Sequence, residues 1–194
     1  MFKLIYNGEK EKKAGKKVFG ETMQKIVEQD PLAVYLDGDI MNSIGTLGLE
    51  KKFPDQVFEC GIQEADMMGI AGGLSAVGKK PYVHTFAAFA ARRAFDQVFI
   101  SIAYAKNNVR IIGSDPGVTS AYNGGTHMPF EDICLYRAIP HSTVLEFTDS
   151  AMLASLLPTL KDRPGLTYCR LNRKEGTAIY SEDSTFEPGK ANLL

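Results

Sequence analysis

Short, mostly apolar runs alternate along the chain with segments of helical periodicity. The apolar runs cover residues 32–36, 82–85, 109–113, 143–147 and 166–171. Strands of this kind, without a clear apolar-polar alternation, are typical of parallel sheets covered by helices on both faces. Helices are expected between them, at residues 18–28, 61–77, 86–105, 130–138 and 150–160. The order predicts an α/β protein, a three-layer α/β/α fold with a mostly parallel sheet.

The charge balance narrows the classes of partner. The 194 residues include 22 basic and 23 acidic side chains, so the chain lacks the basic surplus of a protein that binds nucleic acid or anionic membranes. No stretch approaches the roughly 20 apolar residues of a membrane span, and the apolar start is too short for a signal peptide. Cys60, Cys134 and Cys169 lack zinc-site spacing and are predicted to be small buried hydrophobes. We expect a cytoplasmic protein of one domain.

The expected position of a binding site follows from the parallel sheet. In such sheets ligands bind outside the carboxyl ends of the strands. Residues 37–43, 85–89, 114–127 and 170–173 fall there, and the third segment is a long loop rich in Gly, Ser, Thr and Asn. A loop of that length in a compact domain is usually functional or mobile.

Two carboxyl groups open the predicted helix at residues 61–77. For Asp66 the simplest explanation is the helix dipole, which favours an acid in the first turn by about 0.3–1 kcal/mol. Glu64 has mostly small or apolar neighbours. A carboxyl group in such surroundings can exchange a proton near neutrality. A structural and a chemical role both stay open for Glu64.

The histidines differ in their surroundings. His127 follows Gly124-Gly125-Thr126 in the long loop, where the glycines allow a tight turn that exposes the ring. Its role is either functional or that of a surface residue. His84 lies within a predicted strand and is expected to be a satisfied structural residue, and His141 is expected to be solvated.

Aromatic and basic residues follow two of the predicted strands. Phe86 and Phe89 are three positions apart, with Arg92 one helical turn further on. The two rings belong either to the core or to a slot for a flat ring. Arg170 and Arg173 end the last strand, where they suit either bidentate contact with a phosphate or a salt bridge at the rim.

Several motifs together resemble the pyrimidine-binding domain of transketolases. They are the string at residues 59–74 (ECGIQEADMMGIAGGL), the segment at residues 85–97, the sequence Gly-Gly-Thr-His at 124–127 and Glu-Asp-Ile at 131–133. The resemblance extends from about Ala14 to Leu194. It is strongest to the C-terminal subunit of two-chain transketolases, and weaker to deoxyxylulose-phosphate synthase and to 2-oxo acid dehydrogenase beta subunits.

The resemblance implies a role for each matching residue. Glu64 would hydrogen-bond the aminopyrimidine of thiamine diphosphate and promote removal of the thiazolium C2 proton, and His127 would contact a substrate oxygen. The other cofactor-binding positions would be Phe86, Phe89, Arg92 and Asp39. The other substrate-binding positions would be Ser43, Asp115, Asn123 and Arg170, with Lys16 or Lys17 where the family often has a phosphate-binding arginine.

Two positions depart from the family pattern and leave the sugar specificity open. Asn123 stands where many transketolases have an aspartate, and Asp115 where some have a histidine.

One family motif has no counterpart in this sequence. The Gly-Asp-Gly…Asn motif that holds the diphosphate through Mg²⁺ is missing, and Asp37-Gly38-Asp39 does not replace it.

The resemblance implies a leader at 1–13, a pyrimidine-binding domain at 14–180 and the start of a linker at 181–194. The chain would carry no metal site, would be inactive alone, and would transfer a two-carbon ketol unit between sugar phosphates. It would do so with a diphosphate-binding N-terminal subunit, as a homodimer or heterotetramer. The alternatives are a subunit acting on a 2-oxo acid and a non-catalytic dimerisation domain.

Overall fold

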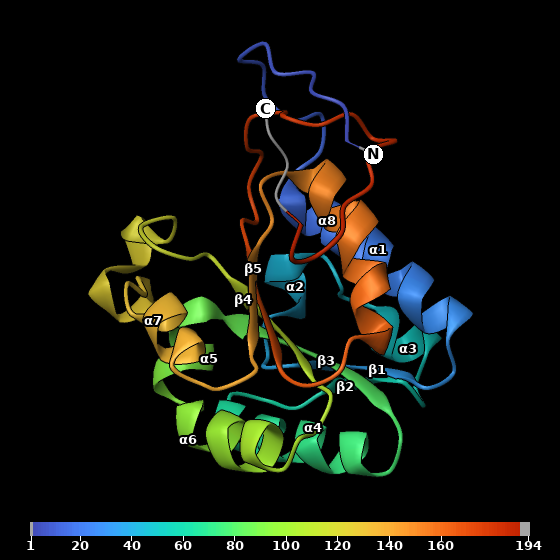
Figure 1. Cartoon of the computed structure of the whole chain (residues 1–194), viewed down its shortest axis with the longest axis vertical. Helices are drawn as coiled ribbons and strands as arrows, with labels where there is room; N and C mark the ends of the chain where they lie inside the picture. Colours follow the sequence, from blue (N-terminus) through green and yellow to red (C-terminus); the bar gives the residue numbers. More distant parts are fainter. Residues whose placement is uncertain (1, 191–194) are drawn as a thin grey trace.

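The sheet is entirely parallel and has the order β2-β1-β3-β4-β6-β5 (Figure 1). The structure is a computed structural model and describes residues 2–190. The strands within that range are β1 (Ala33–Asp37), β2 (Val57–Glu59), β3 (Lys80–Phe86), β4 (Arg110–Ser114), β5 (Thr143–Glu146) and β6 (Thr167–Leu171). The predicted α/β fold with a mostly parallel sheet is confirmed.

Helices cover both faces of the sheet, as the three-layer prediction requires (Figure 1). One face carries α1 (Gly15–Gln29), α8 (Ser150–Leu156), the 3₁₀ turn η4 (Leu157–Asp162) and the short α2 (Met41–Ile44) and α3 (Leu49–Lys52). The other carries α4 (Glu64–Ala76), α5 (Ala87–Arg92), α6 (Phe95–Gln97), the π-helix η1 (Val98–Tyr104) and α7 (Asp132–Arg137). The long loop after β4 contains two 3₁₀ turns, η2 (Ala121–Asn123) and η3 (Gly125–His127).

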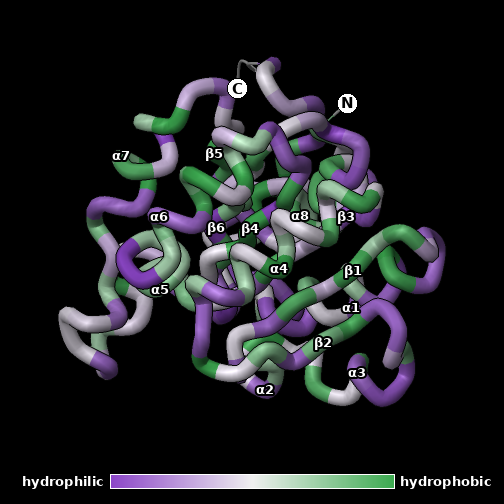
Figure 2. Tube along the Cα trace, turned by 90° about the horizontal axis from the view of Figure 1, so that it is seen from below, coloured by the Kyte–Doolittle hydropathy of each residue, from purple (hydrophilic) through white to green (hydrophobic). Residues whose placement is uncertain are grey.

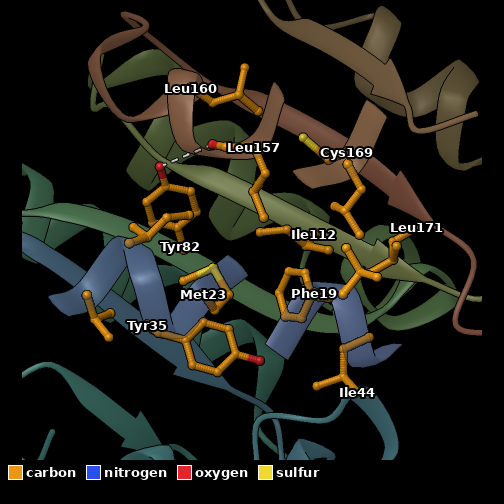
Figure 3. Close-up of a cluster of buried hydrophobic side chains, with 14 of the residues drawn as sticks. Phe19, Met23, Tyr35, Ile44, Tyr82, Ile112, Leu157, Leu160, Cys169 and Leu171 are labelled. Atoms are coloured by element: carbon orange, nitrogen blue, oxygen red, sulfur yellow. Dashed lines mark hydrogen bonds between the residues drawn. The ribbon is translucent and has the colours of Figure 1, made fainter. Parts of the chain in front are cut away.

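The first core lies between α1, α8 and the sheet (Figure 3). Phe19 and Met23 of α1 are fully buried there, because apolar residues recur at helical spacing along that helix. Tyr82 is also buried, and its hydroxyl donates to the carbonyl of Leu157 at 3.5 Å. Figure 2 shows the hydropathy of each residue along the chain: hydrophobic residues lie mainly in the interior and hydrophilic stretches mainly in the outer loops.

The second core depends on small residues that bring elements close together. Met67 and Met68 of α4 are fully buried there, and the rings of Tyr136 and Tyr168 stack at 3.8 Å. A Cβ atom on Gly113 would lie 2.9 Å from the Cα of Ala87. Because that distance is too short for a real contact, glycine at this position allows α5 to lie directly on β4.

The predicted helix at residues 86–105 is wrong as a single element. Strand β3 extends through Phe86, whose extended backbone caps α5. The helix then breaks at Arg93 and Ala94, and continues as α6 and η1. The predicted helix at 150–160 likewise ends early, at Leu156, and continues as the 3₁₀ turn η4, whose second residue is Pro158. A prolyl nitrogen has no hydrogen to donate to a continuing α-helix.

The first and last described segments of the chain lie side by side. The amide of Ile5 donates to the carbonyl of Ile179 at 2.9 Å, and that of Glu11 to the carbonyl of Gly176 at 3.0 Å. The segment predicted to be a leader therefore packs against the end of the domain. The boundaries at 14 and 181 stay predictions, and residues 191–194 of the predicted linker lie outside the described residues.

Two further findings concern membrane-spanning helices and the burial of the cysteines. No helix within residues 2–190 is long and apolar enough to cross a membrane. The prediction that all three cysteines are buried is wrong: Cys169 is buried, Cys60 is half-buried and Cys134 is exposed on α7.

Candidate functional site

The loops expected to form a site meet at the carboxyl ends of the parallel strands. Asp37 of β1 lies opposite His84 of β3, and Phe86 of β3 lies opposite Ser114 of β4. Ser114 in turn lies opposite Leu171 of β6. The segments that follow these four strands therefore leave the sheet beside one another, as the prediction from the parallel topology requires.

Glu64 is a buried carboxyl group at the start of α4. It is 1% exposed. The hydroxyl of Thr85 donates to its Oε1 at 3.1 Å, and Nη1 of Arg93 donates to its Oε2 at 2.7 Å. The side chain of Arg93 is 43% exposed. The surroundings are therefore less apolar than the sequence suggests, because Thr85 and Arg93 are brought in from β3 and the end of α5.

Phe86, Phe89 and His127 form an aromatic group beside Glu64. The ring of His127 lies 5.6 Å from that of Phe86 and 5.0 Å from that of Phe89, both in edge-to-face geometry. The guanidinium carbon of Arg93 lies 4.2 Å from the centre of the Phe89 ring. Arg93 therefore contacts both Glu64 and the aromatic group. The loop histidine and the two phenylalanines are brought together and pack edge to face against one another.

Arg173 joins several of the predicted substrate residues. Its Nε donates to Oδ2 of Asp115 at 2.7 Å, and its Nη1 donates to the carbonyl of Ser43 at 3.3 Å. The guanidinium carbon lies 5.1 Å from the centre of the Phe86 ring. The backbone amide of Lys16 donates to the carbonyl of Arg173 at 3.0 Å. Arg173 thus lies at the centre of this group, although the resemblance favoured Arg170.

Arg170 pairs with two acids near the outer edge of the sheet. Its Nε and Nη2 donate to the two carboxylate oxygens of Asp132, both at 2.8 Å, and its Nη1 donates to Glu146 at 3.2 Å. Burial would raise the pKa of Asp132, but hydrogen bonds from Arg170 and Tyr168 hold that pKa below its usual value. The side chain of Arg170 is 13% exposed, and its charge is paired with both acids.

The remaining predicted residues lie around the same strand ends. Arg92 donates to Glu131 and to backbone carbonyls of the His127 loop. Asp39 is exposed, has a positive φ of 65°, and its amide donates to Oε1 of Glu59 at 2.6 Å. Asn123 is exposed at the end of η2.

His84 belongs to a fully buried polar network below the loops. Its Nδ1 lies 2.8 Å from Oδ2 of Asp37, and its Nε2 lies 3.0 Å from the hydroxyl of Ser114. Tyr35 also donates to Asp37, at 2.6 Å. The prediction that His84 is a satisfied structural residue is confirmed. Its contacts were missed because its partners come from two other strands.

The carboxyl ends of the strands thus bring together a buried carboxyl group, the aromatic group of Phe86, Phe89 and His127, and the arginines Arg93 and Arg173. These groups offer hydrogen-bond acceptors, aromatic rings and guanidinium donors to a ligand. Within residues 2–190, no group of three or more His, Cys, Asp or Glu side chains could hold a metal ion.

Comparisons with known proteins show the family to which the chain is similar. The family model described as "Transketolase, pyrimidine binding domain" matches residues 11–177. The chain is 42% identical over 174 residues to the 6-deoxy-6-sulfo-D-fructose transketolase subunit SqwH of Clostridium sp. (strain MSTE9), covering 90% of this chain and 54% of the relative. It is 35% identical over 182 residues to one subunit of the apulose-4-phosphate transketolase of Phocaeicola vulgatus, covering 93% and 58%. This chain spans little more than half the length of these relatives.

Solved structures share the fold. One, described as "Split gene transketolase, inactive beta4 tetramer", superposes with a TM-score of 0.81 at 36% identity, covering 91% of this chain and 57% of that one. The transketolase of Campylobacter jejuni superposes with a TM-score of 0.77, covering 89% and 27%. At 19% identity the second likeness supports the fold alone.

Proposed function

Since the chain belongs to the transketolase pyrimidine-binding domain family, we propose that it is the pyrimidine-binding part of a composite, thiamine diphosphate-dependent active site. The complete enzyme would transfer a two-carbon ketol unit between sugar phosphates. The observation that carries the proposal is Glu64, a carboxyl group that is 1% exposed beside the aromatic group of Phe86, Phe89 and His127.

The residues at these strand ends fit an aminopyrimidine ring. The phenylalanine rings offer apolar faces and edges, and Glu64 offers oxygens that can accept a hydrogen bond from a ring nitrogen. When bound, thiamine diphosphate supplies the carbon nucleophile that such a transfer needs. Glu64 would hold the proton of the ring nitrogen, while Thr85 and Arg93 keep its carboxylate in place. His127 would hydrogen-bond an oxygen of the substrate, and Asp39 would lie near the reacting carbon.

The group around Arg173 suits the anionic end of the substrate. Nε and Nη2 of Arg173 donate to Asp115 and Nη1 donates to the carbonyl of Ser43, so an anion would bind the guanidinium in place of Asp115, by two parallel hydrogen bonds. Lys16 would add charge without the planar fork of an arginine. In this proposal Arg173 takes the role for which the sequence favoured Arg170.

A sugar with a terminal sulfonate is a second candidate substrate. Asp115 already neutralises part of the charge of Arg173. A sulfonate carries one negative charge, whereas a phosphate monoester carries about 1.5 to 2 at neutral pH, so the weaker cationic group favours the sulfonate. The relative from Clostridium, named for 6-deoxy-6-sulfo-D-fructose, supports this candidate.

The proposal includes a second polypeptide. The diphosphate and Mg²⁺ would be held by a separate N-terminal transketolase subunit, as the split-gene relatives suggest. Exposed apolar side chains on α4 and η1, including Ile70, Ile100 and Tyr104, support burial of this face in an oligomer. The three cysteines are free thiols, which supports a cytoplasmic location.

A reconstitution experiment tests the composite site. The chain is mixed with a diphosphate-binding subunit, thiamine diphosphate and Mg²⁺. Ketol transfer to an aldose phosphate is followed with two sugar donors, a ketose phosphate and 6-deoxy-6-sulfo-D-fructose, and release of CO₂ is followed with pyruvate. We expect turnover with one of the two sugars in the mixture only. Full activity of the chain alone contradicts the composite site. Turnover of pyruvate alone indicates a 2-oxo acid enzyme, and no cofactor binding or turnover in any mixture indicates a non-catalytic domain.

A matched pair of variants tests Glu64. In the mixture, Glu64→Gln should lower turnover at least about 100-fold, because the amide cannot exchange the proton. Asp66→Asn removes the other acid of the same helical turn, which is exposed, and should retain activity. Equal rates for the wild type and Glu64→Gln would reject the role of Glu64.

A further inference from the structure

Arg92 lies at the end of α5 and reaches across to the loop that carries His127. Its Nη1 donates to the carbonyls of Gly125 and Thr126 at 3.2 and 3.4 Å. Its Nη2 donates to the carbonyl of Met128 at 3.0 Å and to Oε2 of Glu131 at 3.1 Å, and its Nε also donates to Glu131. One planar side chain therefore contacts the loop both before and after His127.

Glu131 fixes the far end of this connection. It caps the start of α7, and its Oε2 accepts a hydrogen bond from the amide of Phe130 at 2.9 Å. The guanidinium of Arg92 thus links three elements, namely α5, the His127 loop and α7. A lysine could keep the ion pair with Glu131, but its single nitrogen could not serve the same set of acceptors.

Contacts within the loop also shape it: the amide of His127 donates to the carbonyl of Gly124 at 3.0 Å, and Oγ1 of Thr126 lies 2.8 Å from Nδ1 of His127. These contacts are local to the loop, whereas Arg92 connects the loop to α5.

Gly124 has a positive φ of 78°, Gly125 follows directly, and a Cβ atom on either would meet nothing within 4 Å. Such a backbone has many conformations open to it. The edge-to-face contacts of His127 with Phe86 and Phe89 require one of them.

The neighbouring arginine serves the other side of the aromatic group. Arg93 turns to Glu64 and packs on the Phe89 ring, while Arg92 turns to the loop. Consecutive residues at a helix end point in different directions. Arg93 therefore contacts Glu64 on one side of the aromatic group, and Arg92 contacts the loop of His127 on the other.

We propose that Arg92 is a positioning residue that holds His127 against Phe86 and Phe89, instead of a residue that contacts the cofactor. The effect of Arg92 on turnover rests on the proposed function, in which His127 contacts the substrate. The effect of Arg92 on the position of His127 can be measured whether or not the protein has that function.

The first measurement is NMR of the histidine side chains in the full chain, which has three histidines. The signals of His127, assigned with His127→Gln, should be displaced by the ring currents of Phe86 and Phe89. In Arg92→Gln this displacement should be lost, and in Arg92→Lys and Glu131→Gln it should be partly lost. The buried His84 should be unchanged in all three variants, which shows that they are folded. Arg137→Gln, at an exposed arginine of α7, is the matched control. Unchanged His127 signals in Arg92→Gln would overturn the proposal.

The second measurement is turnover in the reconstituted mixture. Displacing His127 by about 1 Å should cost tenfold to about 100-fold in kcat/KM for the sugar donor, while the Kd of thiamine diphosphate stays unchanged. A weaker Kd with an unchanged kcat would place Arg92 at the cofactor and overturn the proposal. If no mixture is active, the proposed function fails, and the NMR measurement still decides the role of Arg92.

Discussion

Glu64 and Arg93 form an ion pair whose two partners differ in their access to solvent. The Nη1–Oε2 distance is 2.7 Å, and the carboxyl side chain is 1% exposed whereas the arginine side chain is 43% exposed. The arginine can therefore turn outward into water without leaving a buried cation behind. The carboxylate has no such freedom, so a ligand that binds beside the aromatic group would find Glu64 already in place.

A double-mutant cycle tests the strength of this pair. Arg93→Met leaves the carboxylate buried beside Thr85 alone, and we expect a loss of about 2 kcal/mol of unfolding free energy. A fully buried pair would lose about 3–5 kcal/mol, and the exposure of Arg93 reduces that cost. Glu64→Gln/Arg93→Met should recover part of the loss in urea unfolding experiments. Additive single-mutant effects would contradict the coupling.

The pair of Arg92 and Glu131 predicts a pH dependence of stability. Hydrogen bonds from Arg92 lower the pKa of Glu131 from 4.5 to about 2. A carboxyl group with a lowered pKa stabilises the folded state above its unfolded pKa, and this contribution is lost as the pH falls toward the folded value. The difference in Tm between wild type and Glu131→Gln should therefore be largest above pH 5 and shrink between pH 5 and 2. A constant difference over that range would count against the pair.

Replacing Arg110, at the start of β4, should lower the free energy of unfolding strongly. Arg110 is 1% exposed, and its guanidinium donates to the carbonyls of Leu160, Lys161 and Arg163 at 2.6–2.7 Å, where η4 ends. Arg110→Met removes a donor from each carbonyl; that of Leu160 keeps the amide of Arg163 at 3.0 Å, while those of Lys161 and Arg163 lose the hydrogen bonds that Arg110 made, and unsatisfied buried groups cost about 1–3 kcal/mol each. We expect a loss of about 3 kcal/mol or more in urea unfolding. The exposed Arg137→Met should change stability by less than about 0.5 kcal/mol.

The three thiols should react at very different rates. Burial raises the pKa of Cys169 to about 12 and that of Cys60 to about 11, and the thiolate is the reactive form. At pH 7.5 a thiol reagent such as DTNB should modify one cysteine rapidly in the native chain. Cys134→Ser should abolish that phase, since Cys134 is exposed. Two rapid phases would show that a second thiol is accessible.

The sequence predicts the central strands well because burial on both faces leaves continuous apolar runs there. β2 was missed because only Val57 of its three residues is buried, which leaves no such run. That Phe86, Phe89 and His127 lie close together was predictable, since they belong to segments that follow neighbouring strands. The ion pairs of Arg170 and Arg173 were not. Their partners, Asp132 and Asp115, are 38 and 58 residues away in sequence, and only the tertiary structure brings them together.

The position of β6 has a consequence for the order in which the protein can fold. β6 is the last strand in sequence, yet it lies between β4 and β5. Until it inserts, the facing edges of β4 and β5 are open to pairing with other chains, and Asp115 lacks Arg173. Contacts over such long sequence separations form slowly. The contact between Asp115 and Arg173 therefore forms only when the sheet is complete, and a ligand that bound only the finished sheet would draw late intermediates toward the native state.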